Sequence, residues 1–245
     1  MNIIQYFTGD DFKITSGTSF FHNGGKLTIS GLVSGTGYSG KKVEIEVADG
    51  VEFNKLDLIS NPSGYPGDGN RIGYELNSGG ILKVAGDFRL INGFLTQTNG
   101  EMHLEGDVYF DANANTGRGN SSILFTGSND QEYTDVANNA PTGQVEINKT
   151  GGTVTLLSDA NWANAGQNLT FTASNTGALE NGAYILNTNN LTIESGTLDG
   201  GTGAIIADKL KVHTAGTVNL PDAEITLGQD VWVPGCMMCW IYLEP

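Results

Sequence analysis

The chain has 245 residues and a formal net charge of −15 at pH 7, and it contains 35 glycines but only 6 prolines. Apolar residues recur at the alternating period of short strands, which is typical of an all-β fold and excludes a helical bundle. The acidic balance disfavours nucleic acid and anionic membranes as partners, and no apolar run is long enough for membrane insertion as a helix.

Residues 1–15 are rich in large apolar side chains and are predicted to form an N-terminal cap over the β structure that follows. They contain no basic start followed by an apolar core, so we expect no secretory signal peptide in this chain. Residues 26–31 and 43–47 alternate apolar and polar side chains and are predicted as a first pair of strands.

Residues 61–70 form the first conspicuous insertion, because two prolines and three glycines in ten residues exclude regular structure. Tyr65 and Asp68 in this loop are candidate binding residues, since loops that project from a rigid scaffold often carry contacts. The alternative is a surface loop without a binding role.

Segments 82–88 and 102–108 match at an offset of about 20 residues, and each carries a Gly-Asp step. Asp87 and Asp107 should therefore stack one coil apart, and a pair of carboxylates is what glycoside hydrolysis requires. Asp after glycine is also an ordinary turn residue, and we favour that interpretation. Arg89 and His103 lie nearby, but His103 alternates with apolar neighbours and is predicted on the outer face.

A second loop, rich in Asn and Gly, is predicted over residues 111–121, with Asp111 and Arg118 as candidate binding residues. Strands resume at residues 123–127 and 145–156. The calcium-roll pattern of β-helices fails, because Ile205 stands where that motif needs an aspartate. We therefore predict no metal and no cofactor.

The clearest signal is a repeat with an offset of about 20 residues near the C-terminal end: Leu169-Thr170-Phe171, Leu191-Thr192-Ile193 and Leu210-Lys211-Val212. A unit of about 20 residues cannot bury its own apolar face and must stack on its copies. The repeat predicts a β-solenoid, a parallel β-helix-like stack of such coils with capped ends, over residues 16–230. Its leucines should form one internal column, and Asn168 and Asn190 a ladder of stacked amides.

Three further segments continue the pattern, namely Phe125-Thr126-Gly127 before Gln131, the run Val145–Leu156, and Gly182-Ala183-Tyr184-Ile185-Leu186. Together with the leucine repeat, they resemble the repeat regions of large bacterial surface β-solenoids of adhesin type, common among Bacteroidetes. The resemblance covers residues 80–225. Those proteins are exported and much longer, and a short chain without a leader is similar in kind to the β-solenoid fibre and decoration proteins of bacteriophages.

Residues 231–245 depart from the repeat and are predicted to form an apolar C-terminal cap or a contact with another chain. Trp232, Trp240 and Tyr242 are the candidate assembly residues. Cys236 and Cys239 are interpreted as half-buried thiols of this cap, because neither a second zinc-ligand pair nor a thioredoxin-like unit accompanies them.

These patterns favour a non-enzymatic structural or adhesive protein, such as a virion appendage, fibre or decoration component that displays loops. Its expected partners are other protein subunits, in a homo-oligomer or larger assembly, and a surface glycan; its expected place is a virion or cell surface. Two alternatives stay open. One is a carbohydrate-active β-helix enzyme, a polysaccharide lyase or glycosidase that uses Asp87 and Asp107. The other is an assembly module that docks through residues 231–245.

Overall fold

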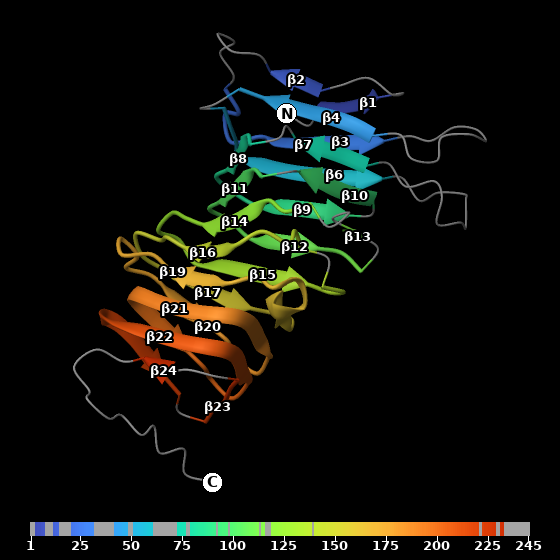
Figure 1. Cartoon of the computed structure of the whole chain (residues 1–245). Helices are drawn as coiled ribbons and strands as arrows, with labels where there is room; N and C mark the ends of the chain where they lie inside the picture. The colour runs from blue at the N-terminus through green and yellow to red at the C-terminus, as the bar shows by residue number, and fades with distance from the viewer. Residues whose placement is uncertain are drawn as a thin grey trace.

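The computed structural model describes residues 3–7, 12–14, 21–31, 42–48, 51–60, 73–76, 79–91, 93–97, 99–112, 114–115, 119–138, 140–220, 222–228 and 231–232. These residues form β-strands and one short 3-10 helix, η1 (Trp162–Ala165). The strands stack as a β-solenoid, which confirms the predicted fold class (Figure 1). None of the described segments is a helix that combines the length and apolar character needed to cross a bilayer.

The stack has three faces, and all strand pairings on them are parallel. Face 1 contains β5 (Glu52–Phe53), β8 (Ile81–Val84), β11 (Glu101–Leu104), β14 (Ser122–Phe125), β16 (Val145–Ile147), β19 (Leu169–Phe171) and β24 (Val231–Trp232). Face 2 contains β1 (Ile3–Phe7), β3 (Lys26–Gly31), β6 (Lys55–Ser60), β9 (Phe88–Ile91), β12 (Val108–Phe110), β15 (Gln131–Asp135), β17 (Thr153–Leu156) and β20 (Ala178–Glu180).

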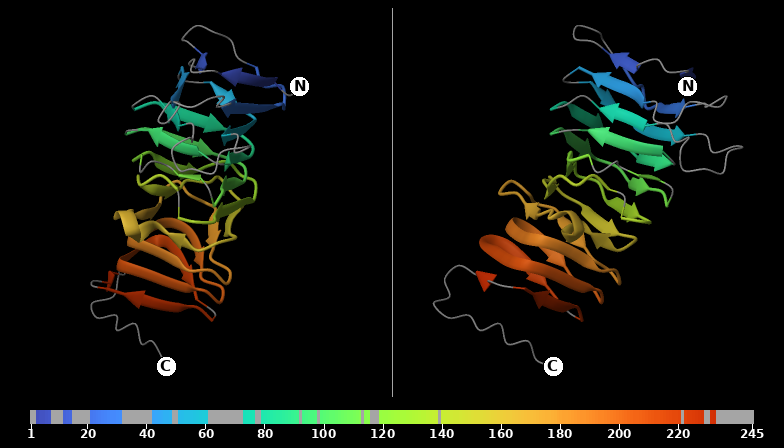
Figure 2. Two further views of the ribbon diagram at one scale, coloured as in Figure 1. Left: turned by 90° about the vertical axis from the view of Figure 1, so that its right-hand side faces the viewer. Right: turned by 45° about the vertical axis from the view of Figure 1, so that its right-hand side comes forward.

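Face 3 differs between the two halves of the stack. In the N-terminal half it is a separate sheet of β2 (Phe12–Ile14), β4 (Lys42–Val47), β7 (Gly73–Leu76), β10 (Gly93–Gln97) and β13 (Ala114–Asn115). In the C-terminal half the same position holds β18 (Ala160–Asn161) and β23 (Glu224–Leu227). The long strands β21 (Leu186–Asp199) and β22 (Ala204–Asn219) bend through all three faces, and Figure 2 shows this change along the stack.

The leucine column predicted from the repeat is confirmed. Leu169 pairs with Leu191 and Leu191 with Leu210, and all three are buried. The column continues towards the N-terminus through Leu82, Met102, Ile123 and Val145, again with partners about 20 residues apart. Burying one such side chain contributes about 1.5–3 kcal/mol, so the column is a main source of the stack's stability.

The first coils are longer than the repeat predicts. On face 2, Leu27 pairs with Leu56 and Leu56 with Phe88, and each of these steps spans about 30 residues. Much of the extra length lies outside the described residues, between β3 and β4 and between β6 and β7. β3 and β4, predicted as one strand pair, lie in different sheets. Within the predicted loop 111–121, Ala114–Asn115 pairs with β10 as a short strand.

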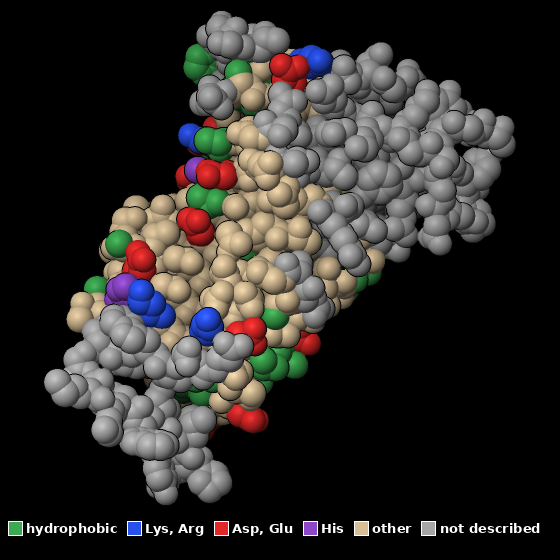
Figure 3. All heavy atoms as spheres, viewed as in Figure 1, with side chains coloured by type: hydrophobic (Ala, Val, Ile, Leu, Met, Phe, Trp, Pro, Cys, Tyr) green, Lys and Arg blue, Asp and Glu red, His purple; other side chains and the backbone are tan. Residues whose placement is uncertain are grey.

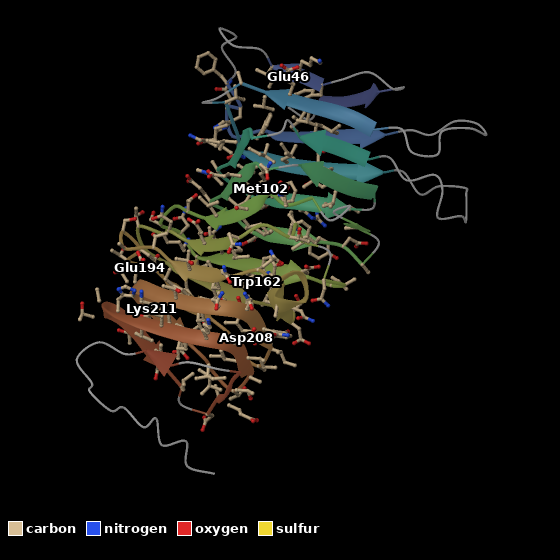
Figure 4. All side chains as sticks on the ribbon, viewed as in Figure 1. Glu46, Met102, Trp162, Glu194, Asp208 and Lys211 are labelled. Carbon is tan, nitrogen blue, oxygen red and sulfur yellow. The ribbon has the colours of Figure 1, made fainter. Side chains whose placement is uncertain are left out.

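Stacked glycines form the corner between face 1 and face 2. A Cβ atom on Gly106 would lie 2.2 Å from the carbonyl carbon of Gly86, so successive coils meet there by backbone contact. Asp87 and Asp107 follow these glycines directly. Inside the stack, edge-to-face rings run from Phe88 through Phe110 to Tyr133. Met102 and Trp162, which are labelled in Figure 4, are buried in the interior of the stack.

The same corner buries a polar network further along the chain. The Lys149 ammonium is fully buried and donates to the carbonyl oxygens of Thr126 (3.3 Å) and Asn129 (2.8 Å) and to Oε1 of Gln131 (2.5 Å). Gln131 in turn donates to carbonyls of the preceding coil, and Asn175 Oδ1 accepts from the backbone N–H of Lys149. Three donors therefore meet three acceptors, as a buried ammonium requires.

Stacked amides cover the outer side of face 1, as predicted. Asn190 Nδ2 donates to Asn168 Oδ1 at 2.7 Å, and the backbone N–H of Asn168 donates to Gln144 Oε1 at 3.1 Å. On face 3, Asn187 Nδ2 donates to Asn161 Oδ1 at 2.8 Å and forms a second amide pair. Each such bond adds about 0.5–1.5 kcal/mol and fixes the register between neighbouring coils.

Candidate functional site

One predicted binding residue, Asp111, lies in a cluster on the outer surface of face 2. Tyr109 on β12 donates its hydroxyl to Asp111 Oδ2 at 3.2 Å. Arg89, which pairs with Tyr109 on the neighbouring strand β9, places its guanidinium carbon 5.4 Å from the centre of the tyrosine ring. We call Arg89, Tyr109 and Asp111 the aromatic patch. It combines a cation, a ring and a carboxylate on one flat surface.

The electrostatics of the patch keep the tyrosine protonated. Partial burial raises the pKa of Tyr109, and the Asp111 charge and hydrogen bond raise it further, while Arg89 acts in the opposite direction. The phenol is therefore a neutral donor at physiological pH. Arg89 is exposed, whereas the Tyr109 side chain is half-buried. The guanidinium is thus open to a ligand, whereas the ring, which Arg89 overlies, is only partly exposed.

Ion pairs flank the aromatic patch on the N-terminal side. Lys26 Nζ lies 2.7 Å from Asp57 Oδ2, although Asp57 is only 3% exposed, and Lys55 Nζ pairs with Asp87. The hydrogen bond to Asp87 and its charge raise the pKa of Lys55. Because each cation meets a carboxylate one coil away, these pairs tie β3, β6 and β9 together and hold the patch in register.

The two aspartates considered for catalysis are brought together but are already engaged. Asp87 and Asp107 stack on successive coils, since the backbone N–H after Asp87 donates to the carbonyl of Asp107. Asp87 binds Lys55, and Asp107 Oδ1 accepts from the backbone N–H of Glu132 at 2.9 Å. These bonds are those of corner residues, as the turn interpretation predicts.

His103 lies on face 1, on the outer side of β11 as predicted. Its Nε2 atom is 2.7 Å from Oε2 of Glu101. Glu146 lies on β16, two strands from β11 along face 1. Burial and the charge of Glu101 raise the pKa of Glu146, and His103 lowers it. The histidine is thus paired with a carboxylate on a different face from the aromatic patch.

Two long connections in the N-terminal half leave from one corner, the boundary between face 2 and face 3. The chain passes there from β3 to β4 and from β6 to β7, and a short connection from β12 to β13 crosses the same boundary. The candidates Tyr65 and Asp68 belong to the connection from β6 to β7, whereas Arg118 comes after β13, in the connection that leads from face 3 to β14 on face 1; all three lie outside the described residues. Asp111 directly follows β12 at the face 2–face 3 corner and is the point at which the aromatic patch meets that corner.

The predicted assembly residues are placed only in part. Trp232 lies in β24, the last described strand, opposite Lys211 of β22. Trp240, Tyr242, Cys236 and Cys239 lie outside the described residues. The prediction that residues 231–245 cap the stack or contact another chain therefore remains a prediction.

Within the described ranges, no group of three or more His, Cys, Asp or Glu side chains is arranged to hold a metal ion. No family model, curated protein or solved structure matches the chain.

Proposed function

We propose that the protein is a non-enzymatic scaffold that displays a binding surface, a structural or adhesive component of a virion or cell surface. The observation that carries this proposal is the placement of the aromatic patch. It lies on a continuous parallel stack, beside the corner from which two long N-terminal connections leave. Stacked coils are stiff, and a stiff support presents a surface without an ordering cost on binding.

A glycan suits the aromatic patch chemically. The C–H face of a sugar ring packs on an aromatic ring such as that of Tyr109, while its hydroxyls bond to charged groups such as Arg89 and Asp111. A single site of this size binds weakly. Many copies on one particle give avidity, which agrees with the proposed place on a virion appendage or surface fibre. The resemblance to bacterial surface solenoids and phage fibres supports the same proposal.

The proposal is tested by binding the fluorescently labelled full chain to an array of neutral and acidic oligosaccharides. We expect Tyr109→Ala and Arg89→Ala to lower the signal on the bound glycans at least about tenfold. Thr155→Ala, an outward residue lower on face 2, is the matched control and should bind as the wild type does. Equal binding by all three variants, or no bound glycan at all, would contradict the proposal.

A carbohydrate-active enzyme is the alternative that the stacked pair of Asp87 and Asp107 keeps open. It predicts that the chain cleaves a polysaccharide and that Asp87→Ala with Asp107→Ala abolishes cleavage. Release of reducing ends or of unsaturated sugars from a polysaccharide panel measures this directly. Cleavage lost in the double variant would replace the scaffold proposal, whereas no cleavage by the wild type supports it.

A further inference from the structure

Face 1 carries most of its charges at its two ends. In Figure 3, acidic side chains gather along the left edge of the upper half, and basic ones gather at the lower left. At the β11 end the acidic side chains Glu101 and Glu105 outnumber the lysine beside them, Lys83 of β8. At the β22 end Lys209 and Lys211 are the basic side chains, and Asp208 directly precedes them. Glu101, Lys209 and Lys211 are exposed.

Between these ends, the outer surface of face 1 is almost uncharged. The outward positions of β14, β16, β19 and β21 that align with those of β11 and β22 are Ser122, Leu124, Gln144, Glu146, Asn168, Thr170, Asn190 and Thr192. Only Glu146 among them carries a charge, and it is half-buried. Glu194 and Asp208 lie at the rims of this surface (Figure 4). In a chain of net charge −15, a surface with so few charges is unusual.

We propose that face 1 binds a second copy of this chain, in a two-fold dimer whose axis lies in the interface parallel to the strands. That rotation reverses the order of the coils. Outward side chains that are in register along the stack, such as Glu101, Ser122, Asn190 and Lys209, form one row, and the rotation places each row opposite the same row of the second copy. Five strand steps separate β11 from β22, which is about 24 Å at one strand spacing per step. The rotation places β11 over β22 of the second copy, and therefore Glu101 opposite Lys209.

The symmetry makes each contact occur twice, which is how a self-complementary surface closes into a dimer. At the centre, β16 lies over β19 of the second copy, so Asn168 faces Gln144 and the hydroxyl of Thr170 faces the half-buried Glu146. The acidic and basic ends meet their opposites. Packing with the coils in the same order would instead oppose like charges at both ends, which strongly disfavours it.

The area agrees with a weak dimer. The strands β11, β14, β16 and β19 of this patch have three or four residues, so a patch about 24 Å long and about 13 Å wide covers roughly 300 Å² on each copy, or about 600 Å² in total. That is less than a stable dimer buries, so the association should be transient and depend on concentration. Weak pairing suits a component that also gains from many copies on one surface.

The decisive experiment is a charge exchange, followed by sedimentation velocity over a range of concentrations. The wild type should dimerise as concentration rises, and Glu101→Lys and Lys209→Glu should each weaken the dimer about tenfold or more. An equal mixture of the two variants should restore dimers, because one copy then has acid at both ends and the other has base at both ends. Glu180→Lys, which makes the same charge change on face 2, is the matched control and should dimerise normally.

Zero-length carbodiimide cross-linking gives a second, independent measurement. Within one copy, Glu101 and Lys209 are about 24 Å apart, so an amide bond between them can form only between copies. Peptide mass spectrometry of the cross-linked dimer should find this bond. A chain that stays monomeric at all concentrations, or dimers that ignore both charge variants, would overturn the inference.

This inference goes beyond the proposed display function and does not rest on it. The dimer surface is on face 1 and the aromatic patch is on face 2, so the two can fail separately. Loss of glycan binding with normal dimers would remove only the proposed function. Loss of dimers with normal glycan binding would remove only the dimer.

Discussion

Lys149 is the residue whose replacement tests the interior of the solenoid most directly. Its ammonium is fully buried and bonded to three oxygens, two of which are carbonyls of the preceding corner. Methionine has a similar length and volume but no donors. Lys149→Met therefore keeps the packing but leaves one buried acceptor, Oε1 of Gln131, and two part-buried carbonyl oxygens without their donor.

The expected loss follows from two opposing effects. A fully buried group left unpaired costs about 1–3 kcal/mol, so about 9 kcal/mol is the upper limit for three acceptors, of which two are only part-buried. Removing the ammonium also removes the cost of burying it, which is several kcal/mol per ion. We expect a net loss of about 2–4 kcal/mol, in line with the removal of one partner from other buried polar networks. Lys149→Ala should lose about 1–2 kcal/mol more, because it also leaves a cavity.

Thermal unfolding followed by circular dichroism measures this loss. For a chain of this length, each kcal/mol lowers the Tm by about 2–4 °C, so Lys149→Met should melt about 4–16 °C below the wild type. Lys209→Met, at an exposed position on face 1, is the matched control and should change stability by no more than about 0.5 kcal/mol. An unchanged Tm for Lys149→Met would show that the network contributes nothing, and the reasoning would fail.

Three other outcomes can be checked on the same samples. Burial lowers the pKa of Lys149 from 10.5, so folding disfavours its charged form. In urea unfolding from pH 7 to 10, the wild type should gain stability relative to Lys149→Met as the pH rises through the lowered pKa. A difference in unfolding free energy that stays constant with pH would contradict this. Gly106→Ala should lower the Tm strongly, because its Cβ meets the backbone of the previous coil, whereas Gly151→Ala, with its nearest neighbour at 3.7 Å, should be tolerated. Leu191→Ala should lower the free energy of unfolding by about 2–5 kcal/mol, because the side chain is buried in the leucine column. Thr192→Ala, at the outward position next to it, should lower it by less than about 0.5 kcal/mol, and the unfolding midpoints of the two variants measure both effects.

The sequence predicts the C-terminal half of the fold because the apolar period is regular there. Leu169, Leu191 and Leu210 recur at nearly constant spacing, and stacking follows from the inability of one coil to bury its own face. The third face of the N-terminal half gives no such signal. Its strands are short, β13 has only two residues, and long connections separate them, so no period is visible.

Tyr109 is the residue of the aromatic patch that sequence reasoning missed, and strand register is what brings it to Arg89. Arg89 pairs with Tyr109 at the same offset along the chain that aligns Leu82 with Met102. Extending that alignment past the Gly-Asp corner would have found the aromatic patch. Lys149 offers no comparable signal, because it lies at a corner where the alternation of inward and outward side chains stops.

Register also explains how one short chain can carry two independent surfaces, and a deletion tests this. Because Thr192 pairs with Lys211, removing residues 192–210 joins Leu191 to Lys211 and takes out one coil without shifting the rows. Each coil contacts only its neighbours, so the shortened chain should stay folded. It lacks Lys209 and one strand step of face 1, so dimers should be lost in sedimentation velocity. The aromatic patch lies several coils away, and glycan binding should persist; a deletion that unfolds the whole chain would show that the stack is one cooperative unit.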